Sequence, residues 1–162
     1  MNLFFRKFGQ GPPLIIIHGL YGSSDNWITI GKRLSEYFEV YLIDQRNHGH
    51  SPHSEEHNYD ILKEDLREFL DQQSIKKSII IGHSMGGKTA MFFSSDYPED
   101  ITNLIIVDIS PLSYITTNST QLLQHKSILE ALVNINITDT KDRDEVDEML
   151  AKSVPQKELR QF

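Results

Sequence analysis

A pentapeptide near the middle of the chain, Gly82–Gly86 (GHSMG), has the pattern G-x-S-x-G. It stands directly after the apolar run Ile79–Ile81 and directly before a segment with helical spacing, so we predict a sharp turn from a strand into a helix. In so tight a turn the central serine takes a strained backbone conformation, its hydroxyl is pushed outward, and the flanking positions must lack side chains. The pattern therefore predicts that Ser84 is a nucleophile. The alternative is a serine that only caps the following helix.

A second glycine-rich turn, His18–Gly22 (HGLYG), follows the apolar run Leu14–Ile17. Glycines let the backbone approach a bound substrate closely, and the helix after Ser84 directs unpaired amides and the positive end of its dipole toward the same place. We predict that the backbone amides of Leu20 and Met85 form an oxyanion hole, which binds the negative charge that develops on an attacked carbonyl oxygen. The alternative for the first turn is an ordinary loop.

Apolar runs without polar alternation occur in regular order with segments of helical spacing. Such runs are typical of strands that are buried on both faces, as in a parallel sheet covered by helices. The order predicts an α/β fold with right-handed crossovers and a doubly wound sheet. The runs are Leu14–Ile17, Val40–Ile43, Ser78–Ile81 and Leu104–Val107, and the helical segments are Trp27–Phe38, Ile61–Leu70 (capped by Asn58 or Asp60) and Ala90–Ser94.

The character of the chain changes after Pro111. A polar stretch, Thr116–Thr120, precedes two segments with helical spacing, Gln121–Val133 and Asp142–Lys152. A proline in the first turn of Ser153–Gln156 is typical of another helix start, and no C-cap signal follows it. We therefore expect a truncated chain that divides into residues 1–110 and residues 111–162.

Four segments together resemble the α/β-hydrolases. The segments are His18–Ser23, Asp44–Ser51, Gly82–Lys88 and Val107–Pro111, in the order of that family. Within the family, the chain is most similar to the small bacterial serine esterases of the YbfF type, which are similar to a mitochondrial hydrolase of the same fold. The resemblance implies a hydrolase of carboxylic esters or thioesters that needs no cofactor. It also implies an early antiparallel strand at Leu3–Phe8 and a helical lid that begins after Asp108 and includes residues 111–162.

The resemblance further implies a triad in the chain order serine, acid, histidine. Ser84 is then the nucleophile, and Asp108 stands where some members place the acid, whereas others place it after a further strand that this chain does not contain. The alternative for Asp108 is a residue that caps the lid segment or shapes the turn before Pro111. Only His125 follows Asp108, and it falls in the expected lid helix. We therefore expect that the catalytic histidine is absent and that the chain as given is nearly inactive.

Six further histidines precede the predicted nucleophile, and we assign them supporting or surface roles. They are His18, His48, His50, His53, His57 and His83. In the loop Asp44–Ser51 we expect Asp44 and Arg46 to brace the turn rather than to react. No fitting pattern of carboxylates accompanies these histidines, so we predict no metal site.

The composition is that of an ordinary globular protein of 162 residues, with 38% hydrophobic and 24% charged residues. A net charge of -7 argues against a nucleic-acid partner, because such a protein needs a basic face. No cysteine is present, which excludes disulfides, and no apolar stretch is long enough for a signal peptide or a bilayer span. We expect a cytoplasmic protein without a membrane partner that acts on a small-molecule acyl ester, and we make no prediction of its oligomeric state.

Two alternatives to hydrolysis stay open, because a fold alone does not determine a reaction. One is a non-catalytic binding module that keeps the fold and its pocket. The other is a different reaction on the same scaffold, such as acyl transfer or a lyase reaction.

Overall fold

The structure is a computed structural model that describes residues 1–112, 120–135, 142–155 and 157–160. The chain divides into two compact units, Met1–Pro111 and Leu112–Phe162.

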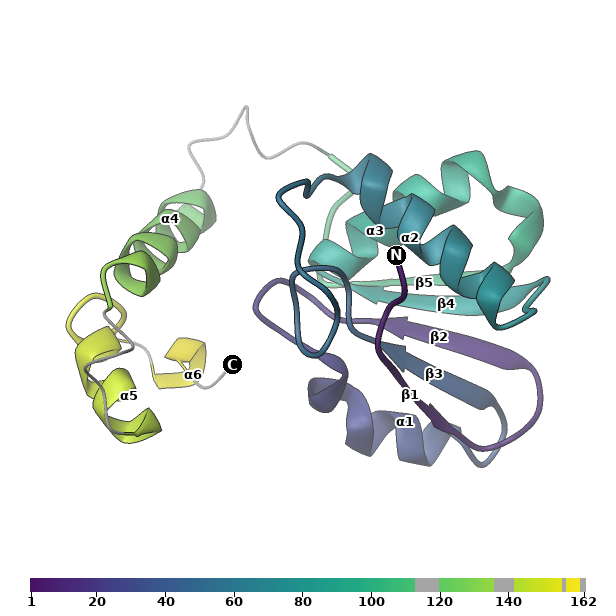
Figure 1. Ribbon diagram of the computed structural model, residues 1–162, viewed down its shortest axis with the longest axis horizontal. Helices are drawn as coiled ribbons and strands as arrows, with labels where there is room; N and C mark the ends of the chain where they lie inside the picture. Colours follow the sequence, from purple (N-terminus) through teal and green to yellow (C-terminus); the bar gives the residue numbers. More distant parts are fainter. Residues whose placement is uncertain (113–119, 136–141, 156, 161–162) are drawn as a thin grey trace. The chain divides into compact units, whose positions relative to one another are not determined.

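The first unit is built on a mostly parallel sheet of five strands (Figure 1). The strands are β1 (Phe5–Phe8), β2 (Pro13–Ile17), β3 (Glu39–Ile43), β4 (Ser78–His83) and β5 (Ile101–Val107). Their order in the sheet is β1-β3-β2-β4-β5, and only the pairing of β1 with β3 is antiparallel. The predicted α/β class, the parallel sheet and the early antiparallel strand are confirmed, although that strand begins at Phe5 rather than at Leu3.

Helices cover both faces of the sheet, with α1 on one face and α2 and α3 on the other (Figure 1). They are α1 (Ile28–Leu34), α2 (Tyr59–Gln72) and α3 (Met85–Asp96), with 3₁₀ turns at Ser24–Trp27 and Pro98–Asp100. Of the two caps considered for α2, Asn58 is the one used, because its side chain accepts a hydrogen bond from the amide of Ile61.

The helix predicted over Trp27–Phe38 is wrong at both ends. A capping box at Ser23 starts a 3₁₀ turn that ends at Trp27, and α1 begins only at Ile28. The helix then ends at Leu34, and Phe38 lies in the lead into β3. Apolar spacing placed Phe38 on the helix because its side chain packs against the same cluster as Leu34.

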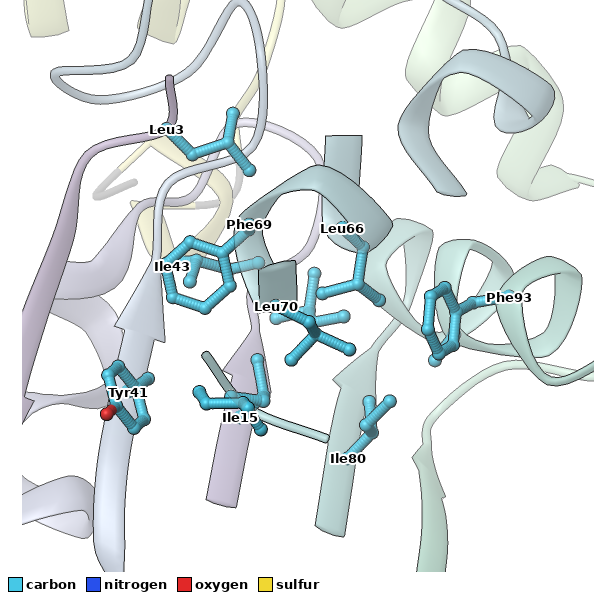
Figure 2. Packing of buried hydrophobic residues seen from close by; sticks show 12 residues of the cluster. Leu3, Ile15, Tyr41, Ile43, Leu66, Phe69, Leu70, Ile80 and Phe93 are labelled. Atoms are coloured by element: carbon cyan, nitrogen blue, oxygen red, sulfur yellow. The ribbon is translucent and has the colours of Figure 1, made fainter. Parts of the chain in front are cut away.

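The core consists of two clusters, one on each face of the sheet, because successive side chains of a strand point to opposite faces. Figure 2 shows the larger cluster, in which α2 and α3 pack on the sheet. Its fully buried members include Ile15, Ile17, Ile43, Leu66, Phe69, Leu70, Ile80 and Phe93. The smaller cluster faces α1 and consists of Leu14, Ile16, Val40 and Leu42. Strands β2 and β3 are therefore buried on both faces, as predicted.

Strand β5 departs from that prediction. Leu104 is 36% exposed and Ile105 is 46% exposed, although the run to which they belong predicts burial on both faces. The reason is its position: β5 is the last strand in the order of the described sheet and pairs with β4 alone.

The second unit consists of helices alone in the part that the structure describes. They are α4 (Thr120–Val133), α5 (Arg143–Ala151) and α6 (Lys157–Arg160). The two predicted helices are confirmed, and the Asp142 side chain caps α5 by accepting from the amide of Glu145 at 3.0 Å. The polar stretch lies outside the described residues except for Thr120, and the expected role of this unit as a lid stays a prediction. No helix among the described residues has the length and apolarity needed to cross a bilayer.

Candidate active site

Ser84 stands at the junction between the last residue of β4 and the first residue of α3, with φ +50° and ψ -117°. Positive φ is uncommon for a residue with a side chain and costs about 1–3 kcal/mol. The turn is tight because both flanking glycines lie against backbone. A Cβ on Gly82 would stand 2.5 Å from the carbonyl oxygen of Gly86, and a Cβ on Gly86 would stand 2.5 Å from that of Ile17. The predicted sharp turn is confirmed.

The neighbouring strand and helix hold the backbone of Ser84 in this conformation. Its amide donates to the carbonyl oxygen of Val107 at 3.0 Å, and its carbonyl oxygen accepts from the amide of Lys88 at 3.1 Å. The Ser84 side chain is half-buried and, among the described residues, makes no capping hydrogen bond to α3. The alternative that Ser84 only caps the helix is therefore wrong, and its hydroxyl is available for other chemistry.

The turn after β2 packs directly against this serine. A Cβ on Gly19 would stand 3.1 Å from Cβ of Ser84 and 2.9 Å from Nδ1 of His83. The carbonyl oxygen of Gly19 accepts two hydrogen bonds, from Nδ1 of His18 at 2.7 Å and from the amide of Gly22 at 3.1 Å. In a trans peptide the N–H points opposite to the C=O, so these two bonds also set the direction of the Leu20 N–H.

The amides of Leu20 and Met85 have no hydrogen-bond acceptor within the described chain. Met85 opens α3, where the first amides of a helix lack intrahelical acceptors and the positive end of the helix dipole lies. Free backbone donors near a nucleophile are the groups that bind a developing oxyanion, and here one follows the serine directly and the other lies in the turn that packs against it. Their role as an oxyanion hole stays a prediction.

His18 is fully buried and is held as a single neutral tautomer. The amide of Gln45 donates to Nε2 of His18 at 3.0 Å, so the ring proton must be on Nδ1, where it bonds to Gly19. Burial lowers the pKa of His18 to about 4, because the interior disfavours the charged imidazolium. With both nitrogens engaged, His18 supports the turn, as expected from the sequence, and is not placed to act as a base.

Asp108 directly follows β5, and its backbone has φ +55°. The residue before it, Val107, lies opposite His83 in the parallel register, so Asp108 is at the same end of the sheet as Ser84. The Asp108 side chain is exposed, and no described residue forms a hydrogen bond or ion pair with it. It is therefore free to accept from a histidine, which a triad acid must do.

The loop after β3 is braced as predicted. The buried carboxylate of Asp44 accepts from the amide of Ser24 at 2.5 Å and from the amide of His50 at 2.8 Å. Arg46 forms two bonds with Asp65 on α2, at 2.5 and 2.7 Å, and both side chains are buried. This loop is a rigid neighbour of the serine turn rather than a source of reactive groups.

The other histidines have structural or surface positions. Nδ1 of His48 lies 2.9 Å from the carbonyl oxygen of Arg46, the ring of His50 packs on Phe4, and His53 is exposed. The side chain of His125 is outside the described residues. No group of three metal-binding side chains occurs in the described part of the chain.

Two buried polar residues of this site, Gln45 and Thr89, were missed in the sequence. The Gln45 amide bonds to the carbonyl oxygen of His18 at 3.1 Å and to the hydroxyl of Thr89 at 2.7 Å. Each looks like an ordinary surface residue in the sequence. Their positions in the sequence were the only indication of burial. Gln45 comes shortly after the buried run Val40–Ile43, and Thr89 lies one helical turn after Met85.

Known proteins are similar to the chain in sequence and in structure. The chain is 31% identical over 150 residues to the esterase YbfF of Escherichia coli, covering 93% of this chain and 57% of that protein. It is 39% identical to the sn-1-specific diacylglycerol lipase ABHD11 of Danio rerio, covering all of this chain and 52% of that protein. A solved esterase from a marine microorganism is 50% identical with a TM-score of 0.94, covering 98% of this chain and 60% of that structure.

The chain thus spans about half the length of the curated relatives that it matches. Its relatives include proteins named as esterases and lipases. The model of the alpha/beta hydrolase fold matches residues 12–157, which takes in the serine turn, the turn after β2 and the residue after β5. The chain belongs to the α/β-hydrolase family.

Proposed function

We propose that this chain supplies the nucleophile and the oxyanion hole of a serine hydrolase that cleaves carboxylic esters or thioesters. The observation that supports it most is the strained, uncapped Ser84, which is followed by the unpaired amide of Met85 and packs against the turn that carries the unpaired amide of Leu20. Relatives named as esterases and lipases support ester cleavage. This activity is proposed for the natural protein at the full length that its gene encodes.

The mechanism follows from the placement of these groups. The Ser84 oxygen attacks the acyl carbonyl carbon as its proton passes to a histidine, and the amides of Leu20 and Met85 stabilise the oxyanion of the tetrahedral intermediate. The intermediate expels the alcohol or thiol, which takes the proton from the histidine, and leaves an acyl-enzyme on Ser84. Water then releases the acid by the same steps. Asp108 orients the imidazole and stabilises its charged form.

In our proposal neither His18 nor His83 is the base. The ring of His18 has both nitrogens bonded, and the ring of His83 lies against Gly19 and Trp27, with its centroid 6.0 Å from that of the tryptophan. Loss of a triad base costs about a millionfold in turnover, so a protein without that histidine would be nearly inactive.

The experiment compares the natural protein with its Ser84→Ala variant on a p-nitrophenyl ester and with a fluorophosphonate probe. We expect Ser84→Ala to abolish both hydrolysis and labelling. Ser94→Ala is the matched control, because Ser94 lies on the same helix and bonds only to the carbonyl oxygen of Met91 at 2.8 Å. Retained activity in Ser84→Ala, or labelling at another serine, contradicts the proposal.

The same assay separates the alternatives. If the natural protein is a non-catalytic binding module, the probe does not label Ser84. An acyltransferase is labelled but yields a new ester rather than a free acid when an alcohol is added, because the acceptor then replaces water in the second step.

A further inference from the structure

We propose that Gln45 and Thr89 are positioning residues that set the spacing between the two oxyanion donors. This inference rests on the proposed function and adds two residues to it. The two donors belong to different elements, Leu20 to the turn after β2 and Met85 to the first turn of α3. A connection between these elements is therefore needed to fix the distance between the donors.

Gln45 holds the turn after β2 at two points. Its backbone amide donates to Nε2 of His18 at 3.0 Å, and its side-chain Nε2 donates to the carbonyl oxygen of His18 at 3.1 Å. The other nitrogen of that ring bonds to the carbonyl oxygen of Gly19, which sets the direction of the Leu20 N–H. Gln45 is only 2% exposed, so no water competes freely for these bonds.

The other end of the Gln45 amide holds α3. Its Oε1 accepts from the hydroxyl of Thr89 at 2.7 Å, and the same hydroxyl lies 3.3 Å from the carbonyl oxygen of Met85. Thr89 is 1% exposed and stands one turn along the helix from Met85. A single side-chain amide thus bridges the carbonyl of His18 and the helix that carries the second donor.

The bridge is specific because the amide is satisfied at both ends. Inside a protein a hydrogen-bonded network is rigid when every member is paired, and loss of one member leaves its partner unpaired at a cost in free energy. An apolar residue at position 45 would leave both the His18 carbonyl and the Thr89 hydroxyl without that partner. The donors would then be free to shift relative to Ser84.

Three variants test this bridge in the natural protein. Gln45→Met keeps the side-chain length without hydrogen bonds, Thr89→Val keeps the shape without the hydroxyl, and Thr89→Ser keeps the hydroxyl. We expect kcat per fluorophosphonate-labelled serine to fall about tenfold to a hundredfold in Gln45→Met and Thr89→Val. The two donors act only in the transition state, so their displacement lowers kcat. KM stays close to the wild-type value, and Thr89→Ser recovers most of the loss. Ser94→Ala again serves as the control.

The affinity for a boronic acid that mimics the tetrahedral intermediate is a second measurement. It would stay unchanged if Gln45 and Thr89 only stabilised the fold. We expect this affinity to fall by the same factor as kcat, because the boronic acid uses the oxyanion hole as the transition state does. A variant that is only partly unfolded would instead have fewer labelled serines, with unchanged kcat and unchanged boronate affinity per labelled site. That result, or wild-type kcat in Gln45→Met, overturns the inference.

Amide NMR of the chain as given tests the bridge without turnover. In Gln45→Met we expect exchange broadening at the amides of Leu20 and Met85 and unchanged hydrogen-exchange protection at Ile15–Ile17 in β2. Unaltered Leu20 and Met85 signals would refute the bridge even if the protein has no esterase activity. The proposed function, by contrast, is refuted if the Ser84→Ala variant stays active. The two failures can therefore be distinguished.

Discussion

Gly86, the second residue of α3, has no space for a side chain, and we predict that Gly86→Ala damages the site more than the fold. An added Cβ would stand 2.5 Å from the carbonyl oxygens of both Ile17 and His18. Both contacts are backbone atoms at the end of a fully buried strand, so neither moves aside as a flexible side chain does. The start of α3, with Met85, must retreat instead.

The magnitude follows from these contacts. Ordinary van der Waals contact begins at 3.4 Å, so the helix start must move by about 0.9 Å. A displacement of about 1 Å in a catalytic group costs about a hundredfold in rate. Overpacking a close-packed interior costs about 1–3 kcal/mol, which lowers Tm by about 3–10 °C in a protein of this size.

The assay measures kcat per labelled serine in the natural protein and Tm in the same sample. Gly31→Ala is the matched control, since Gly31 lies inside α1, far along the chain from Ser84, and the nearest atoms to its added Cβ would belong to the flexible Leu42 side chain, at 3.1 Å. We expect the control to keep its activity and to change stability by no more than about 1 kcal/mol. Wild-type kcat and Tm in Gly86→Ala would refute the steric argument, whereas equal losses in both variants would refute its link to the site.

Three further predictions concern stability. Asp65→Ala leaves the buried Arg46 guanidinium without its carboxylate partner, with the carbonyl oxygen of Glu56 still accepting from it at 2.9 Å, so urea unfolding should show a loss of about 3–5 kcal/mol. Arg46→Met/Asp65→Leu, which removes both charges, should lose much less. Burial lowers the pKa of His18 in the folded protein from 6.5 to about 4. The contribution of His18 to the free energy of unfolding is therefore complete above pH 6.5 and decreases by about 3 kcal/mol as the pH falls toward 4. Its ring ¹⁵N shifts should therefore not titrate between pH 5 and pH 8, and titration near 6.5 would contradict this. Asn58→Ala removes the cap of α2 and should cost about 1 kcal/mol by urea unfolding, with no effect on kcat.

The sequence predicts the fold well where one physical cause dominates. Unbroken apolar runs such as Leu14–Ile17 and Val40–Ile43 become buried strands, because helices cover both faces of the sheet to which these short β-branched and aliphatic segments belong. The run Leu104–Val107 has the same pattern but is partly exposed, since burial depends on what lies beside a strand, and a local pattern does not contain that information. The start of α1 was misplaced for a different reason: the capping box at Ser23 is a local polar signal that competes with apolar spacing.

The candidate site was predicted where backbone sterics demand particular residues. Gly82 and Gly86 mark the turn because a side chain at either position would collide with backbone. Gln45 and Thr89 could not be found in this way, because their importance comes from a bond between residues 44 positions apart. Pairing of buried polar groups is a tertiary property, and neither partner has a local pattern that reveals it.

The distribution of backbone strain joins the fold to the site. Among the residues that the structure describes, those with side chains at positive φ are Tyr21, Asn47, Ser74, Ser84 and Asp108. All except Ser74 follow a parallel strand at its carboxyl end, one each after β2, β3, β4 and β5. Ligands of open α/β sheets bind at that edge, and strained conformations persist only where the surroundings over-determine them. The strained residues therefore lie at the edge of the sheet where we propose that the chemistry takes place. The hydrogen bonds of Ser84 to Val107 and Lys88 hold its backbone in the strained conformation.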